Sequence, residues 1–233
     1  KSYDEFEIDK LFDKYNHNDK LTMLTYIANC LFKTNKYKQS LSYAEILLKN
    51  MCEYDSFLYD KYLFFYYNIL VQNYSITDKD KALDYLDKAN KNEVIKKIPA
   101  YNSFIYLNRS LIYYDQDDFK RSKQNISRLI MQEDFLLLDK SFQLKILITS
   151  VIIIYNVSKK NTKEKINEIK NNYNTLLKTE NHYRDTMFLE LISKKLNSGD
   201  FEKDKDVFLS NITDEESKEL DIIGYNSWVK EHI

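Results

Sequence analysis

His182 stands among the residues of this sequence best suited to chemistry. Its neighbours are Glu180, Tyr183, Arg184 and Asp185, and a histidine held by a carboxylate can act as a general base. The same group of polar residues is also typical of the solvated start of a helix, and we favour that interpretation. No catalytic residue is therefore predicted.

The motifs that carry most enzyme chemistry are absent from the sequence. It has two glycines in 233 residues, which leaves no glycine-rich phosphate loop and no Gly-x-Ser-x-Gly turn around a nucleophile. The two cysteines, Cys30 and Cys52, are too few for a metal cluster. Cys30 lies between Ile27 and Leu31 and is expected to be buried. We expect a protein that is not an enzyme and that uses no metal and no cofactor.

The charge balance argues against a nucleic-acid partner. Lys and Arg number 35, Asp and Glu number 36, and the net charge is −1, so no overall field attracts phosphates. The most apolar run, 146–155, has about half of the ~20 residues that a membrane span needs, and it predicts a buried helix. The few cysteines fit a reducing compartment. We expect a cytoplasmic protein, and a chain that starts at Lys1 is also compatible with a leader removed earlier.

The composition indicates an all-α protein. Two glycines and one proline are far below the usual ~7% and ~5%, and sheets need these residues at their tight turns. A bias towards Lys, Asn, Ile and Tyr points to an AT-rich genome. The 20 tyrosines and 13 phenylalanines fall mostly at helix-packing positions, so we interpret them as core residues and not as a platform for stacking bases.

A repeat of 40 to 42 residues organises the sequence. In four segments a small residue is followed by apolar or small residues four and seven positions later, which returns to one face of a helix. These segments predict the second helices of four pairs: Ser40, Ala44, Leu47; Ala82, Leu86, Ala89; Ser122, Ile126, Leu129; and Thr162, Ile166, Ile169. Upstream of each, one small or polar residue marks the close contact point of a first helix: Ala28, Asn68, Ser110 and Ser150.

This pattern resembles the tetratricopeptide repeat (TPR) family, whose helix-turn-helix unit places small residues at fixed positions. The best copy is 108–119, with Asp117 and Phe119 in its turn, and the second is 24–47, with Asn35 and Tyr37 in its turn. Asn35 and Asp117 stand where the family has glycine, and both residue types tolerate left-handed backbone. The spacing here exceeds the ~34 residues of the family.

The resemblance implies a right-handed superhelical stack of antiparallel helix pairs, a TPR-like α-solenoid, in a single domain 1–233. Residues 1–20 would form an N-terminal capping helix, 21–177 about four helix pairs, and 178–233 C-terminal capping helices. Thr213 and Glu216 predict a capping box that starts one last helix, which ends near Trp228. Solenoids need such polar-faced ends for solubility.

The resemblance also implies a binding surface, because proteins of this kind hold partners on the concave face lined by their first helices. By the family's register this face would contain Asn29, Phe32, Tyr62, Phe65, Gln72, Phe104, Leu111 and Tyr114. Amide side chains can pair with the backbone of a peptide, and aromatic rings can hold its apolar side chains. The alternative is that later helices fold over this face and bury it.

We therefore expect a non-catalytic scaffold that binds a protein or peptide partner, with no direct nucleic-acid contact and no membrane span. A second hypothesis is the peptide-sensing domain of a bacterial transcription regulator, whose DNA-binding head would lie before residue 1. A helical-repeat RNA binder is least favoured because the chain has no surplus of positive charge.

Overall fold

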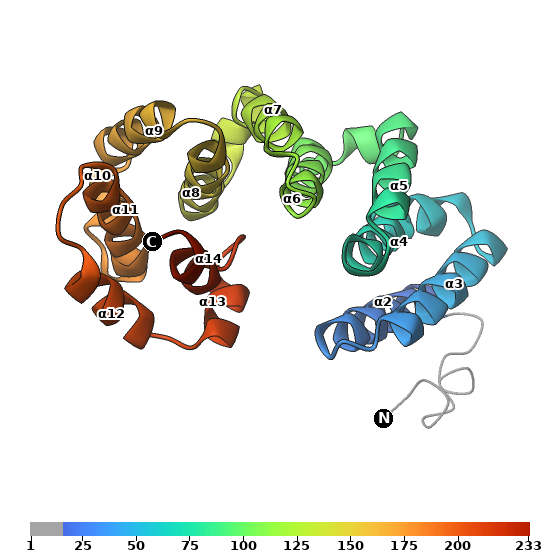
Figure 1. The fold of residues 1–233 in the computed structure, drawn as a ribbon. Coiled ribbons are helices and arrows are strands. Elements are labelled where there is room, and N and C mark those ends of the chain that lie inside the picture. Colours follow the sequence, from blue (N-terminus) through green and yellow to red (C-terminus); the bar gives the residue numbers. More distant parts are fainter. Residues whose placement is uncertain (1–15) are drawn as a thin grey trace. The chain divides into compact units, whose positions relative to one another are not determined.

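A computed structural model describes residues 16–233 of the chain, and within that range it contains helices and no strand (Figure 1). The chain divides into two compact units, Lys1–Ile112 and Tyr113–Ile233. The prediction of an all-α protein is confirmed. The expected N-terminal capping helix 1–20 lies outside the described residues as far as residue 15, and its last residues belong to α2, which begins at His17.

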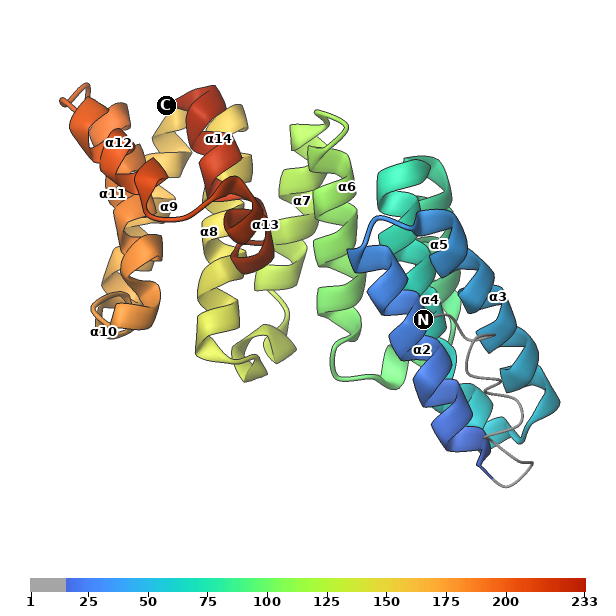
Figure 2. The same ribbon diagram turned by 90° about the horizontal axis from the view of Figure 1, so that it is seen from below.

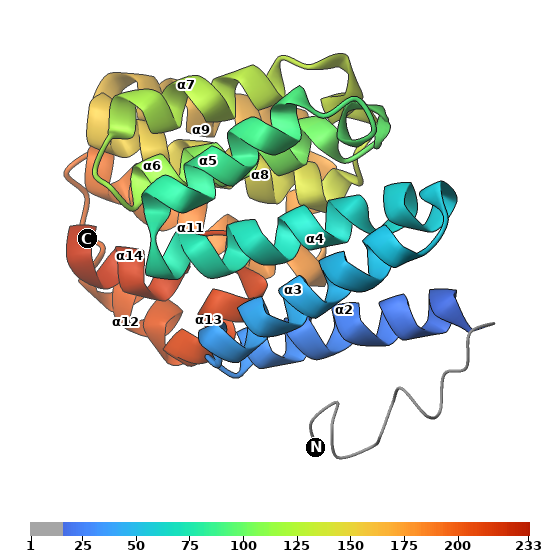
Figure 3. The same ribbon diagram turned by 90° about the vertical axis from the view of Figure 1, so that its right-hand side faces the viewer.

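The first unit is a series of antiparallel helices in chain order. Helices α2, α3, α4 and α5 lie side by side in succession (Figure 3), and shorter turns lead from α5 towards α6. The bounds are α2 His17–Lys33, α3 Tyr37–Glu53, α4 Ser56–Thr77, α5 Lys79–Lys91, the 3-10 turn η2 Ile95–Lys97, the π-helix η3 Ser103–Leu107 and α6 Asn108–Tyr114, which crosses the boundary between the units.

The second unit continues with helix pairs and ends in two short helices. Helix α7 packs on α8, and α8 on α9. The bounds are α7 Phe119–Ile130, η4 Glu133–Leu137, α8 Lys140–Val157, α9 Lys159–Asn172, α10 Asn174–Leu177, η5 Glu180–His182, α11 Tyr183–Leu196, α12 Glu202–Ser210, α13 Asp214–Leu220 and α14 Tyr225–His232. The capping box of Thr213 and Glu216 is confirmed. The prediction of a single last helix was wrong, because the helix that begins at Asp214 ends at Leu220 and a second helix, α14, begins at Tyr225.

Two kinds of turn join the helices of a pair, and they alternate along the chain. After α2, α6 and α11 the backbone turns left-handed at Asn35, Asp117 and Ser198, with φ of 60°, 57° and 57°. In each case the next N–H reaches a carbonyl five residues back, as Lys36 does to Leu31 at 2.8 Å, which is the usual way to end a helix at a left-handed residue. The left-handed backbone predicted at Asn35 and Asp117 is confirmed.

The other turn has a single residue between two helices. Asp78 joins α4 to α5 and Ser158 joins α8 to α9, both with extended backbone at φ of −162° and −160°. Each side chain accepts the N–H three residues on, and so begins the second helix. The left-handed turns recur at intervals of 82 and 81 residues and the one-residue turns at 80. The structural period is therefore two helix pairs, about twice the period seen in the sequence.

The small residues predicted at helix contacts are in the core. All twelve side chains of the four triplets are at most 1% exposed. Ser40 shows why a small residue is needed, since its hydroxyl donates to the Ala28 carbonyl at 2.8 Å and so brings the two helix backbones together. In α4 the residue that reaches this contact is Asn73, which donates to Ser40 Oγ at 2.9 Å. The predicted residue, Asn68, is only half-buried.

Helix α8 is the most apolar helix of the second unit. Every residue of 146–155 is buried, as predicted, because α8 is covered by α7 and α9 and by the aromatic residues of α14. Its length and composition would also suit a membrane span. The prediction for Cys30 was wrong: both cysteines are exposed and free, since Leu24 and Ala28 define the buried side of α2 and Cys30 lies off that side.

Candidate binding face

In the first unit α2 and α4, the helices that lead the first two pairs, run parallel to each other, one repeat apart. In the first unit the Tyr62 hydroxyl donates to the Asn18 carbonyl at 2.9 Å, and Lys61 Nζ donates to Asn18 Oδ1 at 2.7 Å. These contacts join α4 to the start of α2 across 43 to 44 residues of sequence. Asn29 and Gln72 are also 43 residues apart, so the same register brings Gln72 beside Asn29.

We define the α2–α4 face as Asn29 and Phe32 of α2 with Phe65, Asn68 and Gln72 of α4. The three α4 residues are spaced by three and four positions, which places them on one side of the helix. Phe65 is 40% exposed, and the other four side chains are half-buried. The sequence pattern predicts a helix contact for Asn68, so its place on this face was not predicted. The face therefore offers two aromatic rings and three amides.

The amides of the α2–α4 face differ from the other buried or half-buried asparagines of their unit. Asn50, Asn73 and Asn108 each donate to the carbonyl four residues back, at 2.7 to 2.8 Å. The side chains of Asn29, Asn68 and Gln72 form no hydrogen bond with any residue that the structure describes. Each has donors and an acceptor open to a ligand. Half-buried amides with free hydrogen-bonding groups suit the backbone of a bound peptide.

Two residues predicted for the concave face lie in the core, and this part of the prediction was wrong. Tyr62 is 4% exposed because its ring sits under the start of α2, and Phe104 is 5% exposed and meets Phe64 edge to face at 5.1 Å between ring centroids. Phe104 belongs to the π-helix η3. A π-turn adds a residue to the turn and shifts every position around it, so the 3.6-residue period does not place Phe104 correctly.

The last two predicted residues fall near the boundary between the units. Leu111 is half-buried. Tyr114, in the second unit, is also half-buried and lies near Asn156 of α8. Burial, followed by the nearby carboxylates of Glu231 and Asp115, raises the pKa of Tyr114 to about 12. The ring of Tyr114 is therefore held against its own unit.

In the second unit the leading helices are covered by the end of the chain. Helix α14 lies beside α8 and α11 (Figures 1 and 2). Trp228 meets Tyr155 of α8 at 5.0 Å and Phe188 of α11 at 5.5 Å between ring centroids, and Tyr225 stacks on Phe188 at 4.1 Å. These side chains are at most 7% exposed. The expectation that later helices can bury the leading helices is met in this unit.

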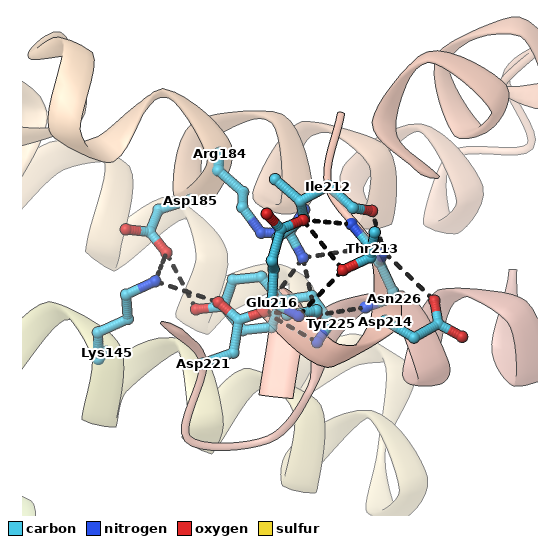
Figure 4. A network of polar contacts seen from close by, with 11 residues as sticks. Lys145, Arg184, Asp185, Ile212, Thr213, Asp214, Glu216, Asp221, Tyr225 and Asn226 are labelled. Carbon is cyan, nitrogen blue, oxygen red and sulfur yellow. Dashed lines mark hydrogen bonds and ion pairs between the residues drawn. The ribbon is translucent and has the colours of Figure 1, made fainter. Parts of the chain in front are cut away.

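A buried polar network fixes this arrangement (Figure 4). Asp221, between α13 and α14, pairs with Arg184 at 3.1 Å and with Lys145 at 3.3 Å. Lys145 also pairs with Asp185 at 2.8 Å, and the Tyr225 hydroxyl donates to Asp185 at 3.0 Å. Two cations thus balance two carboxylates, which is the condition for charges to stay buried.

Arg184 is held from several directions. Its Nη2 donates to Ser217, Asp221 and Asn226 at 2.9 to 3.1 Å. Its guanidinium lies over the ring of Phe208 at 4.4 Å, an attraction that partly replaces the hydration lost on burial. Arg184 therefore ties α11 to α12, α13 and α14.

His182 belongs to this network, and its expected place at a solvated helix start was wrong. It is 5% exposed. One ring nitrogen, Nε2, lies 2.9 Å from Ser141 Oγ, and the other, Nδ1, lies 2.7 Å from Asp185 Oδ2. The register between α8 and α11 brings them together, since Ser141 and His182 are 41 residues apart. The alternative considered from sequence, a histidine held by a carboxylate, is the one that the geometry matches.

The contacts from Ser141 to His182 Nε2 and from His182 Nδ1 to Asp185 are those of a hydrolase triad, but the surroundings favour a structural role. A hydrolase of this type needs free N–H groups to stabilise an oxyanion. The N–H groups of Ser141 and Phe142 both bond the capping carboxylate of Asp139, at 2.9 and 3.2 Å. Asp185 is further shared with Lys145. We interpret the Ser141–His182–Asp185 contacts as a link between α8 and α11.

Buried tyrosines give this fold an alkaline limit, which is a first prediction. Burial raises the pKa of Tyr66 to about 12, and burial with Asp185 and Asp221 nearby raises the pKa of Tyr225 well above its usual range. In the unfolded chain these groups titrate near pH 10. Between pH 10 and about 12 only the unfolded state loses these protons, so the free energy of unfolding should fall as pH rises.

The measurement is chemical denaturation across this pH range together with tyrosinate absorbance. Tyr66→Phe should remove one tyrosine that titrates late and weaken the pH dependence of the free energy of unfolding. Tyr26→Phe, at a side chain 64% exposed, should change neither the number of late-titrating tyrosines nor this pH dependence. Simultaneous titration of all tyrosines in the folded protein at their usual pKa would contradict the burial described here.

No protein family, no curated protein and no solved structure matches this chain.

Proposed function

We propose that this chain is a non-catalytic, TPR-like helical-repeat scaffold that holds a protein or peptide partner on the α2–α4 face. The observation that carries the proposal is the set of three amides, Asn29, Asn68 and Gln72, that lie half-buried on neighbouring parallel helices without a hydrogen-bond partner among the described residues. Phe32 and Phe65 flank them and supply apolar contacts. A superhelical arrangement of the pairs belongs to the same proposal.

The second unit supports placing the partner on the first. Its own leading helices, α8 and α11, already carry α14 with Tyr225 and Trp228 packed on them. In this unit a helix with large aromatic side chains packs on two leading helices, which is the kind of ligand that such a pair of helices can bind. An extended or helical segment of another protein with large apolar side chains is thus the proposed ligand of the α2–α4 face.

The test is a double substitution, Asn29→Ala/Gln72→Ala. Stability should change by less than about 0.5 kcal/mol, because neither amide bonds within the described fold. Loss of one backbone hydrogen bond to a ligand is expected to weaken binding by about 1 to 3 kcal/mol, or roughly five- to 150-fold in Kd. Partners retained by the parent protein from cell extract would be identified, purified and titrated against both proteins.

Gln39→Ala provides the matched control, since Gln39 is an exposed amide of α3 outside the face. It should bind like the parent. Equal affinity of the parent and the double variant for every retained partner would place the binding surface elsewhere. Unfolding of the double variant would show that the two amides are packing groups.

A further inference from the structure

One side of α7 carries a hollow of about 490 Å³ in the second unit. We define the α7 stripe as Lys120, Lys123, Gln124, Ser127 and Arg128, which line this hollow. Their spacing along the helix places them on one side, over about 16 Å from Lys120 to Met131. Two apolar side chains lie at the edges of the hollow: Met131, at the end of α7, is 82% exposed, and Val157 of α8 is 45% exposed.

The charge of this stripe is not neutralised as it is on the equivalent helices. Helix α7 has four cations and no Asp or Glu within Phe119–Ile130. On α5, Asp84 pairs with Lys88 at 2.7 Å, and on α9, Glu168 pairs with Lys165 at 2.8 Å. Arg121 pairs with the cap Asp118, whereas Lys120 and Lys123 form no ion pair with a described residue.

The repeat shows at which positions α7 differs from the equivalent helices α5 and α9. Two residues after the small contact residue, α5 has Asp84 and α9 has Glu164, and α7 has Gln124. Five residues after it, α5 has Asp87 where α7 has Ser127. Helix α7 therefore has no carboxylate at the position where both α5 and α9 have one, and none at the position of Asp87 in α5. Unpaired cations around a hollow raise the local concentration of anionic ligands.

We propose that the α7 stripe binds an acidic segment of another protein, with carboxylates on Lys120, Lys123 and Arg128 and an apolar side chain against Met131 or Val157. The exposed apolar edges favour a peptide over a nucleic acid, since phosphates gain nothing from them. This site lies in the second unit and does not depend on the α2–α4 face.

The experiment uses the full chain and a fluorescent helical peptide with three Glu residues on one side and Leu at each end. A peptide with Gln in place of each Glu and a single-stranded DNA of equal length are the comparison ligands. The variant is Gln124→Glu/Ser127→Glu, which gives α7 the carboxylates that α5 has. The carboxylate introduced at position 124 would lie four residues from both Lys120 and Arg128, so it should support the helix.

The Glu peptide should bind the parent and lose roughly tenfold or more in affinity on the variant, since the two introduced carboxylates neutralise the cations of the stripe and repel the Glu side chains. Added salt should also weaken it. Asn167→Glu/Asn171→Glu, which adds the same charge at exposed positions of α9, should bind like the parent. No binding of the Glu peptide, or equal binding of the Gln peptide, would overturn the proposal. Tighter binding of the DNA that is lost on the variant would identify a polyanion surface instead.

Discussion

Replacement of Asp221 by alanine is expected to destabilise the second unit by about 3–5 kcal/mol. Among the described residues, Asp221 is the one carboxylate that pairs with Arg184, whose other hydrogen-bond partners there are Ser217 and Asn226. Without Asp221, Arg184 would be a mostly buried cation with no counter-charge, and removal of one member of a buried pair has an effect of this size. Lys145 would keep Asp185.

The double variant Arg184→Met/Asp221→Leu separates the pair's own contribution from the effect of an orphaned charge. Apolar residues of similar volume often replace a buried pair at little cost, so the double variant should be more stable than Asp221→Ala. Denaturant melts of the parent, both variants and Asp214→Ala would measure this. Asp214 has an exposed partner in Lys230 and should matter little. A small effect of Asp221→Ala would mean that the network is hydrated and does not hold α14 in place.

Local signals in the sequence were enough to predict the helix pairs. Ser40, Ala82, Ser122 and Thr162 could be found because a close helix contact tolerates only a small side chain, whatever its partner. The turns at Asn35 and Asp117 could be found because few residue types adopt left-handed backbone. Ser198 makes the same turn and was missed, since serine gives no such signal. The best two copies in the sequence are the first and third pairs, which share this turn.

The polar network and part of the candidate face could not be predicted in the same way. Lys145 and Asp221 are 76 residues apart, and no local pattern links them. His182 looked solvated because its sequence neighbours are polar, yet it is buried and contacts Ser141 of α8 and Asp185 of α11. Phe104 was misplaced because the π-turn around it changes the helical phase. Asn68 was misassigned because the long helix α4 shifts the contact with Ser40 to Asn73.

A substitution of Trp228 decides whether α14 is an integral part of the second unit or a removable cover. Trp228→Ala should destabilise the unit by about 3–5 kcal/mol, the usual range for a large aromatic residue in a core. The ring is 2% exposed and lies against Tyr155, Phe188 and His232. Its Nε1 has no hydrogen-bond partner among the described residues, so the contribution comes from packing.

Trp228→Phe is the matched control for this prediction. It keeps a ring, removes the unpaired donor and should cost less than about 1.5 kcal/mol. Because Trp228 is the only tryptophan, unfolding would be followed by circular dichroism, with hydrogen exchange reporting on α14. A large loss for Trp228→Ala would show that α8 and α11 are covered as part of folding, in agreement with the proposal that the partner binds the α2–α4 face. If α14 exchanges freely while the unit keeps its stability, α14 is a cover that a partner can displace, and α8 and α11 become a second candidate surface.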